Sequence, residues 1–199
     1  MAEKPPSTVD QWLERETARI RKALENASRY FDSNDELTVN TLEAVYGQEN
    51  SFGILMGQRG STRAAGHFQF KPKTAKRYGL GVSKQNDQRF DIDRASSAAA
   101  RYLKDLDLGA FNAGEGRVAV AQRLAEKAGK DPQSWSDVAE YLANETRRYV
   151  ERISLYEVEF AKKSPADNSR KEKGVRKGKY RCTEGHWVTI DDRPVFVCD

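Results

Sequence analysis

Residues 49–52 read Glu49-Asn50-Ser51-Phe52, at the point where a helical pattern stops and a glycine-rich stretch begins. Upstream, apolar residues from Val39 to Tyr46 recur at three- and four-residue steps, which predicts a helix that ends near Glu49. Downstream, residues 50–66 contain four glycines and predict a long loop. We therefore expect an acidic side chain in the last turn of a helix, directly before a loop.

The rest of the chain is also predominantly helical in pattern. Further helices are expected at residues 8–31, at 74–78 with Pro72 near the start, at 95–106 and at 118–128, with one or two more in 136–160. Turn regions are expected at 32–37 and 108–116. Strand patterns occur only at 187–190 and 195–197, around a turn at 191–194. The sequence predicts a mainly α fold with four parts: a leader and N-terminal helix (1–37), a helical domain (38–162), a basic linker (163–181) and a small C-terminal β hairpin (182–199).

Charge and composition exclude several classes of protein. The formal net charge of +4 is concentrated in residues 169–181, which hold seven Lys/Arg and one Glu. A solvated linker is the simplest interpretation of this run, and a nucleic-acid-binding segment is the alternative. No stretch of about 18 apolar residues is present, so no membrane-spanning helix is expected. His67 and His186 are isolated and no Cys-x-x-Cys motif occurs, so neither a metal site nor a cofactor is expected.

Four segments together resemble the lysozyme-like lytic transglycosylase (SLT) family. They are residues 49–52 (ENSF), 65–75 (AGHFQFKPKTA), 110–118 (AFNAGEGRV) and 145–150 (ETRRYV). Residues 87–91 (DQRFD) with Ala95-Ser96 look most like the membrane-bound murein transglycosylase D branch. The resemblance covers residues 38–153, and it implies a lysozyme-like helical domain that cleaves peptidoglycan glycan strands.

Glu49 is the expected catalytic residue. The negative end of the helix dipole and apolar neighbours both disfavour the charged form of its carboxyl group, so its proton stays available for the leaving oxygen of a glycosidic bond. The next acidic residue is Asp87, and residues 50–86 carry seven Lys/Arg without a carboxylate. A single acid suits a transglycosylase that forms a 1,6-anhydro product. Hydrolysis by a muramidase stays open if Asp87 or Asp91 folds back toward Glu49.

The resemblance also assigns substrate-binding roles. Ser51 and Ser61 are candidates for hydrogen bonds to sugar or to Glu49, with backbone capping as the alternative. Gln69 and Asn112 are expected to bind N-acetyl and hydroxyl groups, although Asn112 can instead fix its turn. Tyr149 is expected to point its hydroxyl at the cleaved bond, with core packing as the alternative, and Phe111 to stack on a sugar face.

The chain departs from the family pattern at Asn50, at His67-Phe68 and at Phe111, where the family usually has Ser, Leu-Met and Tyr. The segment before Phe111 is also shorter than usual, which puts the position of Asn112 in question.

The implied substrate places the protein in the periplasm or outside the cell. The cysteine pair Cys182 and Cys198 fits that setting, because a disulfide closing this loop forms only outside the reducing cytosol. No signal segment is visible near residue 1, so we expect either a removed signal or delivery by a secretion-system or phage-particle partner. A non-catalytic wall-binding assembly factor is the alternative from a different class of function.

Overall fold

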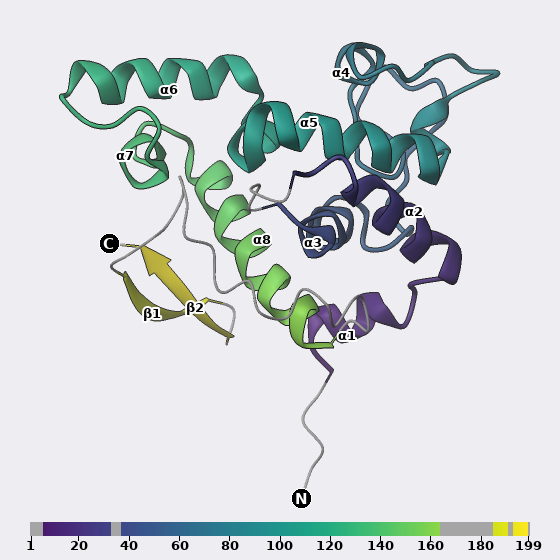
Figure 1. Ribbon diagram of the computed structural model, residues 1–199, viewed down its shortest axis with the longest axis horizontal. Coiled ribbons are helices and arrows are strands. Elements are labelled where there is room, and N and C mark those ends of the chain that lie inside the picture. The colour runs from purple at the N-terminus through teal and green to yellow at the C-terminus, as the bar shows by residue number, and fades with distance from the viewer. Residues whose placement is uncertain (1–5, 33–36, 164–184, 191–192, 199) are drawn as a thin grey trace, which may run out of the picture. The chain divides into compact units, whose positions relative to one another are not determined.

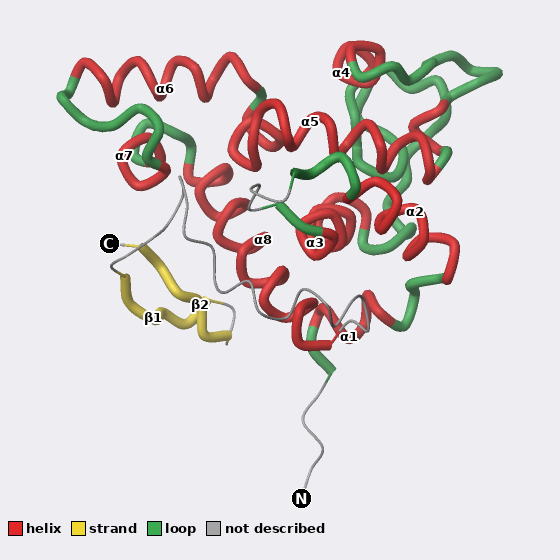
Figure 2. Tube along the Cα trace, in the orientation of Figure 1, coloured by secondary structure: helices red, strands yellow, loops and turns green. Residues whose placement is uncertain are grey.

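The computed structural model describes residues 6–32, 37–163, 185–190 and 193–198 (Figure 1). These residues are mostly helical, as Figure 2 shows, so the predicted mainly α fold class is confirmed. The helices are α1 (Thr8–Leu13), α2 (Ala18–Ser28), α3 (Val39–Asn50), α4 (Pro72–Arg77), the short 3₁₀ helix η1 (Gln88–Phe90), α5 (Ile92–Ala113), α6 (Glu115–Lys127), α7 (Trp135–Ala139) and α8 (Asn144–Lys163).

The chain forms two compact units. Of the described residues, unit 1 comprises 6–32, 37–105 and 153–163, and unit 2 comprises 106–152, 185–190 and 193–198. The long helices α5 and α8 each contribute one segment to each unit. The domain boundaries expected from the sequence, at residues 37/38, 162/163 and 181/182, stay predictions.

Unit 1 has a core built from helix α2 against helix α3 and from a cluster of aromatic side chains. Leu24 on α2 and Leu42 on α3 are completely buried. The Trp12 ring from α1 meets the Tyr156 ring of α8 edge-on, with centroids 4.7 Å apart. Stacked contacts of Trp12 with Phe52 and Phe160 extend this cluster to the turn after α3. The aromatic packing therefore supports the end of α3, where Glu49 lies.

The N-terminal region differs from the single helix predicted for residues 8–31. The structure has two helices there, because residues 14–17 interrupt the hydrogen-bond ladder. Each new helix begins at a capping side chain. Ser7 forms a capping box with Asp10, and the Thr17 hydroxyl accepts a hydrogen bond from the Ile20 N–H at 3.2 Å. The apolar periodicity continues across the break, which is why the pattern alone indicated one helix.

Helix α5 is longer than predicted. A turn is expected at residues 108–116, but the helix continues through residues 108–113. Leu108 and Ala110 are buried within this extension. Gly109 suggested a break, but an added Cβ there would lie 2.9 Å from the Trp135 ring, so its lack of a side chain permits packing inside a continuous helix. The helix ends only before Gly114, whose positive φ of 85° starts α6 in a new direction. The predicted helices ending at Glu49 and starting near Pro72 are confirmed.

A glycine in the middle of α3 is required by the Trp12 ring. A Cβ atom on Gly47 would lie 2.3 Å from Trp12 Cε3, whereas one on Gly116 in α6 would meet nothing within 4 Å. Gly47→Ala is therefore expected to lower the free energy of unfolding by about 1–3 kcal/mol despite the higher helix propensity of alanine. Gly116→Ala is the matched control and is expected to raise it by roughly 0.5 kcal/mol. Urea denaturation measures both, and equal shifts in the two variants would contradict the packing argument.

Two strands lie near the C-terminus. Strand β1 (Gly185–Ile190) pairs antiparallel with β2 (Arg193–Cys198), with Gly185 opposite Cys198 and Ile190 opposite Arg193. The predicted turn residues 191 and 192 lie outside the described residues, so the C-terminal hairpin stays a prediction there. Residues 164–184, which contain nearly all of the predicted basic linker and Cys182, also lie outside them. The pairing of Cys182 with Cys198 stays a prediction.

Across the described ranges, every helix is too short or too polar to span a bilayer. The same part of the chain has no cluster of three or more His, Cys, Asp or Glu side chains that could hold a metal ion.

Candidate active site

Glu49 lies in the last turn of α3 and is half-buried, at the helix end that the sequence predicted. Ser51 closes the helix in a left-handed conformation, with φ 55°, and its N–H donates to the Gly47 carbonyl at 2.8 Å. Phe52 and Gly53 also have positive φ values, of 56° and 95°. The backbone therefore reverses sharply just after Glu49, and non-glycine residues at two of these positions store strain.

The buried amide of Asn50 holds this turn in place. Its Oδ1 accepts a hydrogen bond from the Gly53 N–H at 2.7 Å, and its Nδ2 donates to the His67 carbonyl. Asn50 is completely inaccessible to solvent, so both bonds compensate for the burial of its polar atoms. Asn50, one of the departures from the family pattern, thus joins the first sequence motif to the second.

The imidazole of His67 joins three segments of unit 1. Its Nδ1 lies 3.0 Å from the Tyr46 hydroxyl of α3, and its ring hydrogen-bonds the backbone of Phe90. The main-chain N–H of His67 donates to the Arg89 carbonyl at 2.9 Å. Burial lowers the pKa of His67 to about 4, and burial raises the pKa of Tyr46 to about 12. Both side chains are therefore neutral at physiological pH and act as a fixed support behind the end of α3.

The stability of the protein should depend on the protonation of His67. Between pH 6.5, the ordinary pKa of histidine, and about pH 4, the unfolded chain binds a proton that the folded chain excludes. The free energy of unfolding is therefore expected to fall as the pH drops through this window, and to be insensitive to this group above it. His67→Leu should remove that part of the pH dependence in urea denaturation series. His186→Gln, which retains His67, should keep it, and an unchanged profile in His67→Leu would contradict the assignment.

The side-chain amide of Gln69 is bound within its own loop. It takes a left-handed conformation, with φ 48°, and its Nε2 donates to the carbonyls of Leu55 and Gly66, each at 2.8 Å. Both amide hydrogens are therefore used to hold the loop. With both hydrogens used in this way, the amide oxygen is the group that Gln69 would offer to a ligand, and its binding of an N-acetyl group stays a prediction.

Asp87, directly before η1, and Arg89, within η1, form a buried ion pair. Asp87 Oδ2 accepts from Arg89 Nη2 at 2.7 Å and from the Gly60 N–H at 2.7 Å, and Oδ1 accepts from Arg89 Nε at 2.9 Å. Burial alone would raise the pKa of Asp87, but the hydrogen bonds from Arg89 and Gly60 lower it below its ordinary value. The Asp87 carboxylate is therefore ionised, and both of its oxygens are occupied by hydrogen bonds from Arg89 and Gly60.

The guanidinium group of Arg89 also holds three backbone segments together. Its Nη1 donates to the carbonyls of Arg63 and Phe70, and its Nη2 to that of Ser61, all at 2.9 Å. The Ser61 hydroxyl accepts a bond from the Arg63 N–H at 3.0 Å, so the capping alternative describes what Ser61 does here. Its role in binding sugar stays a prediction.

In unit 2, the third and fourth motifs meet through a hydrogen bond. Asn112 Oδ1, at the end of α5, accepts from the hydroxyl of Thr146 in the first turn of α8 at 2.9 Å. Phe111 and Asn112 are half-buried, and Tyr149 is buried on α8. The contact fixes Asn112 just before the turn at Gly114, in line with the turn-fixing alternative.

The predicted site residues fall in both units. Glu49, Ser51, Ser61 and Gln69 belong to unit 1, and Phe111, Asn112 and Tyr149 belong to unit 2. Sequence reasoning assigned no role at the site to Tyr46, Arg89 or Thr146. Tyr46 lies one helical turn before Glu49, and Arg89 lies two residues after Asp87, so spacing to an acidic residue was the signal available for each.

Comparison with known proteins identifies a family match that includes Glu49 and Asn112 but ends before Tyr149. The transglycosylase SLT domain family matches residues 27–134 of this chain. The chain is 32% identical over 100 residues to membrane-bound lytic murein transglycosylase D of Escherichia coli strain K12, covering 45% of this chain and 22% of that protein.

Two further relatives are named membrane-bound lytic murein transglycosylase F. The one from Maricaulis maris is 33% identical over 98 residues, which cover 41% of this chain and 20% of the relative. The one from Marinobacter nauticus is 54% identical over 72 residues, which cover 28% of this chain and 14% of the relative. The matched part of the chain thus spans about a fifth or less of the length of these relatives.

Proposed function

Because the chain belongs to the transglycosylase SLT domain family, we propose that it is a lytic transglycosylase that cleaves the glycan strands of peptidoglycan. The scissile bond is the β-1,4 bond between N-acetylmuramic acid and N-acetylglucosamine. Such enzymes act on wall material outside the cytoplasm, which fits the predicted periplasmic or extracellular location. The route by which the chain reaches the wall, through a secretion system or a phage particle, stays a prediction.

In the proposed reaction, Glu49 serves first as acid and then as base. Its carboxyl proton passes to the leaving glycosidic oxygen as the bond to the muramic acid C1 breaks, and the N-acetyl group of the same sugar stabilises the cationic centre. The Glu49 carboxylate then takes the proton of the C6 hydroxyl as that oxygen bonds to C1. The product is a 1,6-anhydro sugar, Glu49 is again protonated, and no water enters the reaction.

This proposal rests on one observation: the next acidic residues after Glu49, Asp87 and Asp91, already accept hydrogen bonds within the fold. No carboxylate occurs in residues 50–86, and both oxygens of Asp87 are bound to Arg89 or Gly60. Asp91 Oδ1 accepts from the N–H groups of Asp93 and Arg94 at 3.1 and 3.2 Å, so it caps α5. This supports chemistry with one acid rather than the two carboxylates that most glycosidases use.

The substrate-binding assignments remain part of the proposal. For unit 1, Ser51 and the amide oxygen of Gln69 are proposed to contact sugar. For unit 2, Phe111, Asn112 and the Tyr149 hydroxyl are proposed, separately, to do the same. Gln69 and Asn112 are each held within their own unit by a side-chain hydrogen bond, which supports a pre-organised amide at each position.

Product analysis tests the proposal. Intact sacculi digested by the full chain should release fragments with 1,6-anhydromuramic ends, and mass spectrometry should show these to be one water lighter than fragments with reducing ends. Fragments with reducing ends alone would identify the chain as a muramidase. No release at all, with binding to sacculi retained, would favour the wall-binding alternative.

A further inference from the structure

A polar cavity lies in unit 1, and the residues that line it do not include those assigned to the reaction. It has a volume of about 400 Å³ and is open to solvent. Its lining residues come from α2, the long loop, the segment between α4 and η1, η1 itself and the start of α5. They are Arg19, Arg59, Asn86, Asp87, Gln88, Phe90, Asp91 and Arg94. Three of these residues are arginines and two are aspartates, so the side chains that line the cavity carry more positive than negative charge.

One of these arginines is held in place by its neighbours. The Arg59 guanidinium lies over the Phe90 ring, 4.7 Å from its centroid, and its Nη1 donates to the Asp87 carbonyl at 3.4 Å. Stacking on a ring keeps the planar fork oriented while its remaining N–H groups stay available. Phe90 is itself fixed through its backbone, which His67 binds. Arg59 is therefore a pre-oriented donor and not a loosely solvated side chain.

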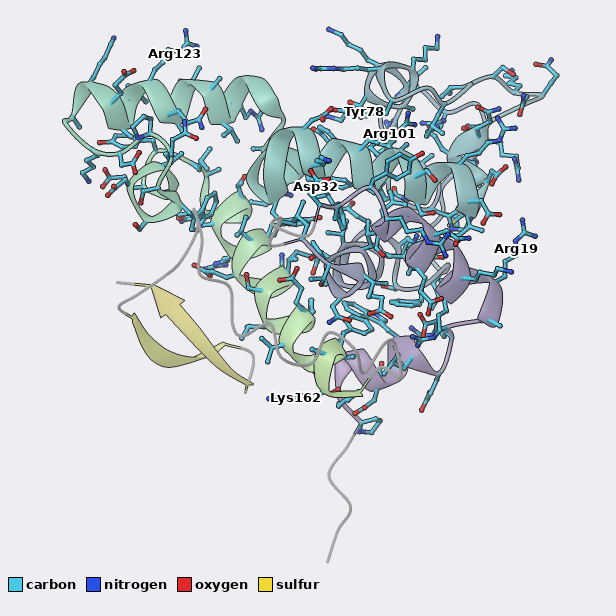
Figure 3. The ribbon with its side chains drawn as sticks, in the orientation of Figure 1. Arg19, Asp32, Tyr78, Arg101, Arg123 and Lys162 are labelled. Carbon is cyan, nitrogen blue, oxygen red and sulfur yellow. The ribbon has the colours of Figure 1, made fainter. Side chains whose placement is uncertain are left out.

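The acidic residues at the cavity are already compensated. The Asp87 carboxylate is neutralised by the buried Arg89, and Asp91 accepts N–H groups at the positive end of α5. Arg94 lies 3.4 Å from Asp91 and Arg19 lies 3.5 Å from Asp93, in pairs whose side chains are largely exposed. Such surface pairs are weak, so they do not prevent either arginine from binding another anion. Figure 3 shows Arg19 extending outward from α2.

We propose that this cavity binds an oxyanion group, a carboxylate or a phosphate, through the guanidinium groups of Arg59 and Arg94, with Arg19 at its edge. Guanidinium forks match the paired oxygens of both anions. The amide groups of Asn86 and Gln88 supply further polar contacts for the rest of the ligand; Gln88 Oε1 already accepts from the Gly81 N–H at 2.7 Å, which leaves its NH₂ group to donate. The site does not depend on Glu49, so the inference stands or falls apart from the proposed reaction.

Binding to the full chain at low ionic strength tests this site. Isothermal titration would use three probes: inorganic phosphate, an N-acetylated dipeptide with a free C-terminal carboxylate, and the same dipeptide as its C-terminal amide. Saturable one-site binding of phosphate or of the free-acid peptide, weakened by added salt, is the expected result. Binding of phosphate alone identifies a phosphate ligand, and binding of the free acid but not of the amide identifies a peptide carboxylate. Equal binding of acid and amide without phosphate binding, or no saturation in the millimolar range, would overturn the proposal.

Variants locate the binding. Arg59→Lys keeps the charge but loses the fork, and it should weaken binding roughly fivefold; the double variant Arg59→Ala/Arg94→Ala should weaken it at least about thirtyfold. Arg123→Ala is the matched control, because Arg123 is an exposed arginine on α6 whose Nε donates only to its own helix, at Ala119. Glu49→Gln should leave the affinity unchanged. Equal losses in the control and the double variant would show a nonspecific charge effect and contradict the site.

Discussion

Glu49→Gln is expected to lower the rate of glycan cleavage by about a thousandfold, because the amide has no proton to donate and cannot act as a base. The side chain keeps nearly the same shape, so the free energy of unfolding should change little. Release of soluble fragments from sacculi, measured beside urea denaturation of the same preparations, separates the two effects.

Asp91→Asn is the matched control for this variant. Asparagine caps helices as well as aspartate does, so α5 should keep its start, and activity should stay close to that of the parent chain. Loss of activity in Asp91→Asn equal to that in Glu49→Gln would show that a second carboxylate takes part. Retained activity in Glu49→Gln would remove Glu49 from the reaction altogether.

The second large effect is expected at Asp87. Asp87→Asn should lower the free energy of unfolding by about 3–5 kcal/mol, because it leaves the guanidinium of Arg89 charged, buried and without its counterion. Both side chains of the pair have no exposed surface. Denaturant titration measures the effect.

Asp32→Asn is the comparison for Asp87→Asn. Asp32 pairs with Lys104 at 2.8 Å, but its side chain is 68% exposed, so its loss should change stability by no more than about 0.5 kcal/mol. Figure 3 shows where Asp32 lies. Similar effects of the two substitutions would mean that burial of the Asp87–Arg89 pair does not set its contribution.

The sequence predicted the local features of this fold well where one signal dominated. The end of α3 followed from helical periodicity meeting a run of glycines, and the start of α4 followed from Pro72 at the first helical position. The break at residues 14–17 and the extension of α5 past Gly109 were mispredicted. In the first case a capping side chain overrode continuous periodicity, and in the second the packing of Trp135 accommodated a glycine inside a helix.

The same difference between local and tertiary signals holds for the candidate active site. The position of Glu49 in the last turn of a helix depends on local sequence and was predictable. The hydrogen bond between Asn50 and His67, and that between Tyr46 and His67, join residues 17 and 21 positions apart. Such contacts depend on the path of the loop, which spacing does not encode. At Gln69, for example, the sequence does not show that the amide hydrogens are bound by the loop carbonyls of Leu55 and Gly66.

The way in which Arg89 organises the loop has a consequence for how this region tolerates sequence divergence. Apart from Asp87, its partners are backbone carbonyls, at Ser61, Arg63 and Phe70. Exchanging the side chains of Ser61 or Arg63 leaves those acceptors in place, so relatives can vary there and still fold the loop along the same path. The side chains that determine the backbone path of residues 61–70 are therefore those of Asp87 and Arg89, which lie more than fifteen residues further along the chain.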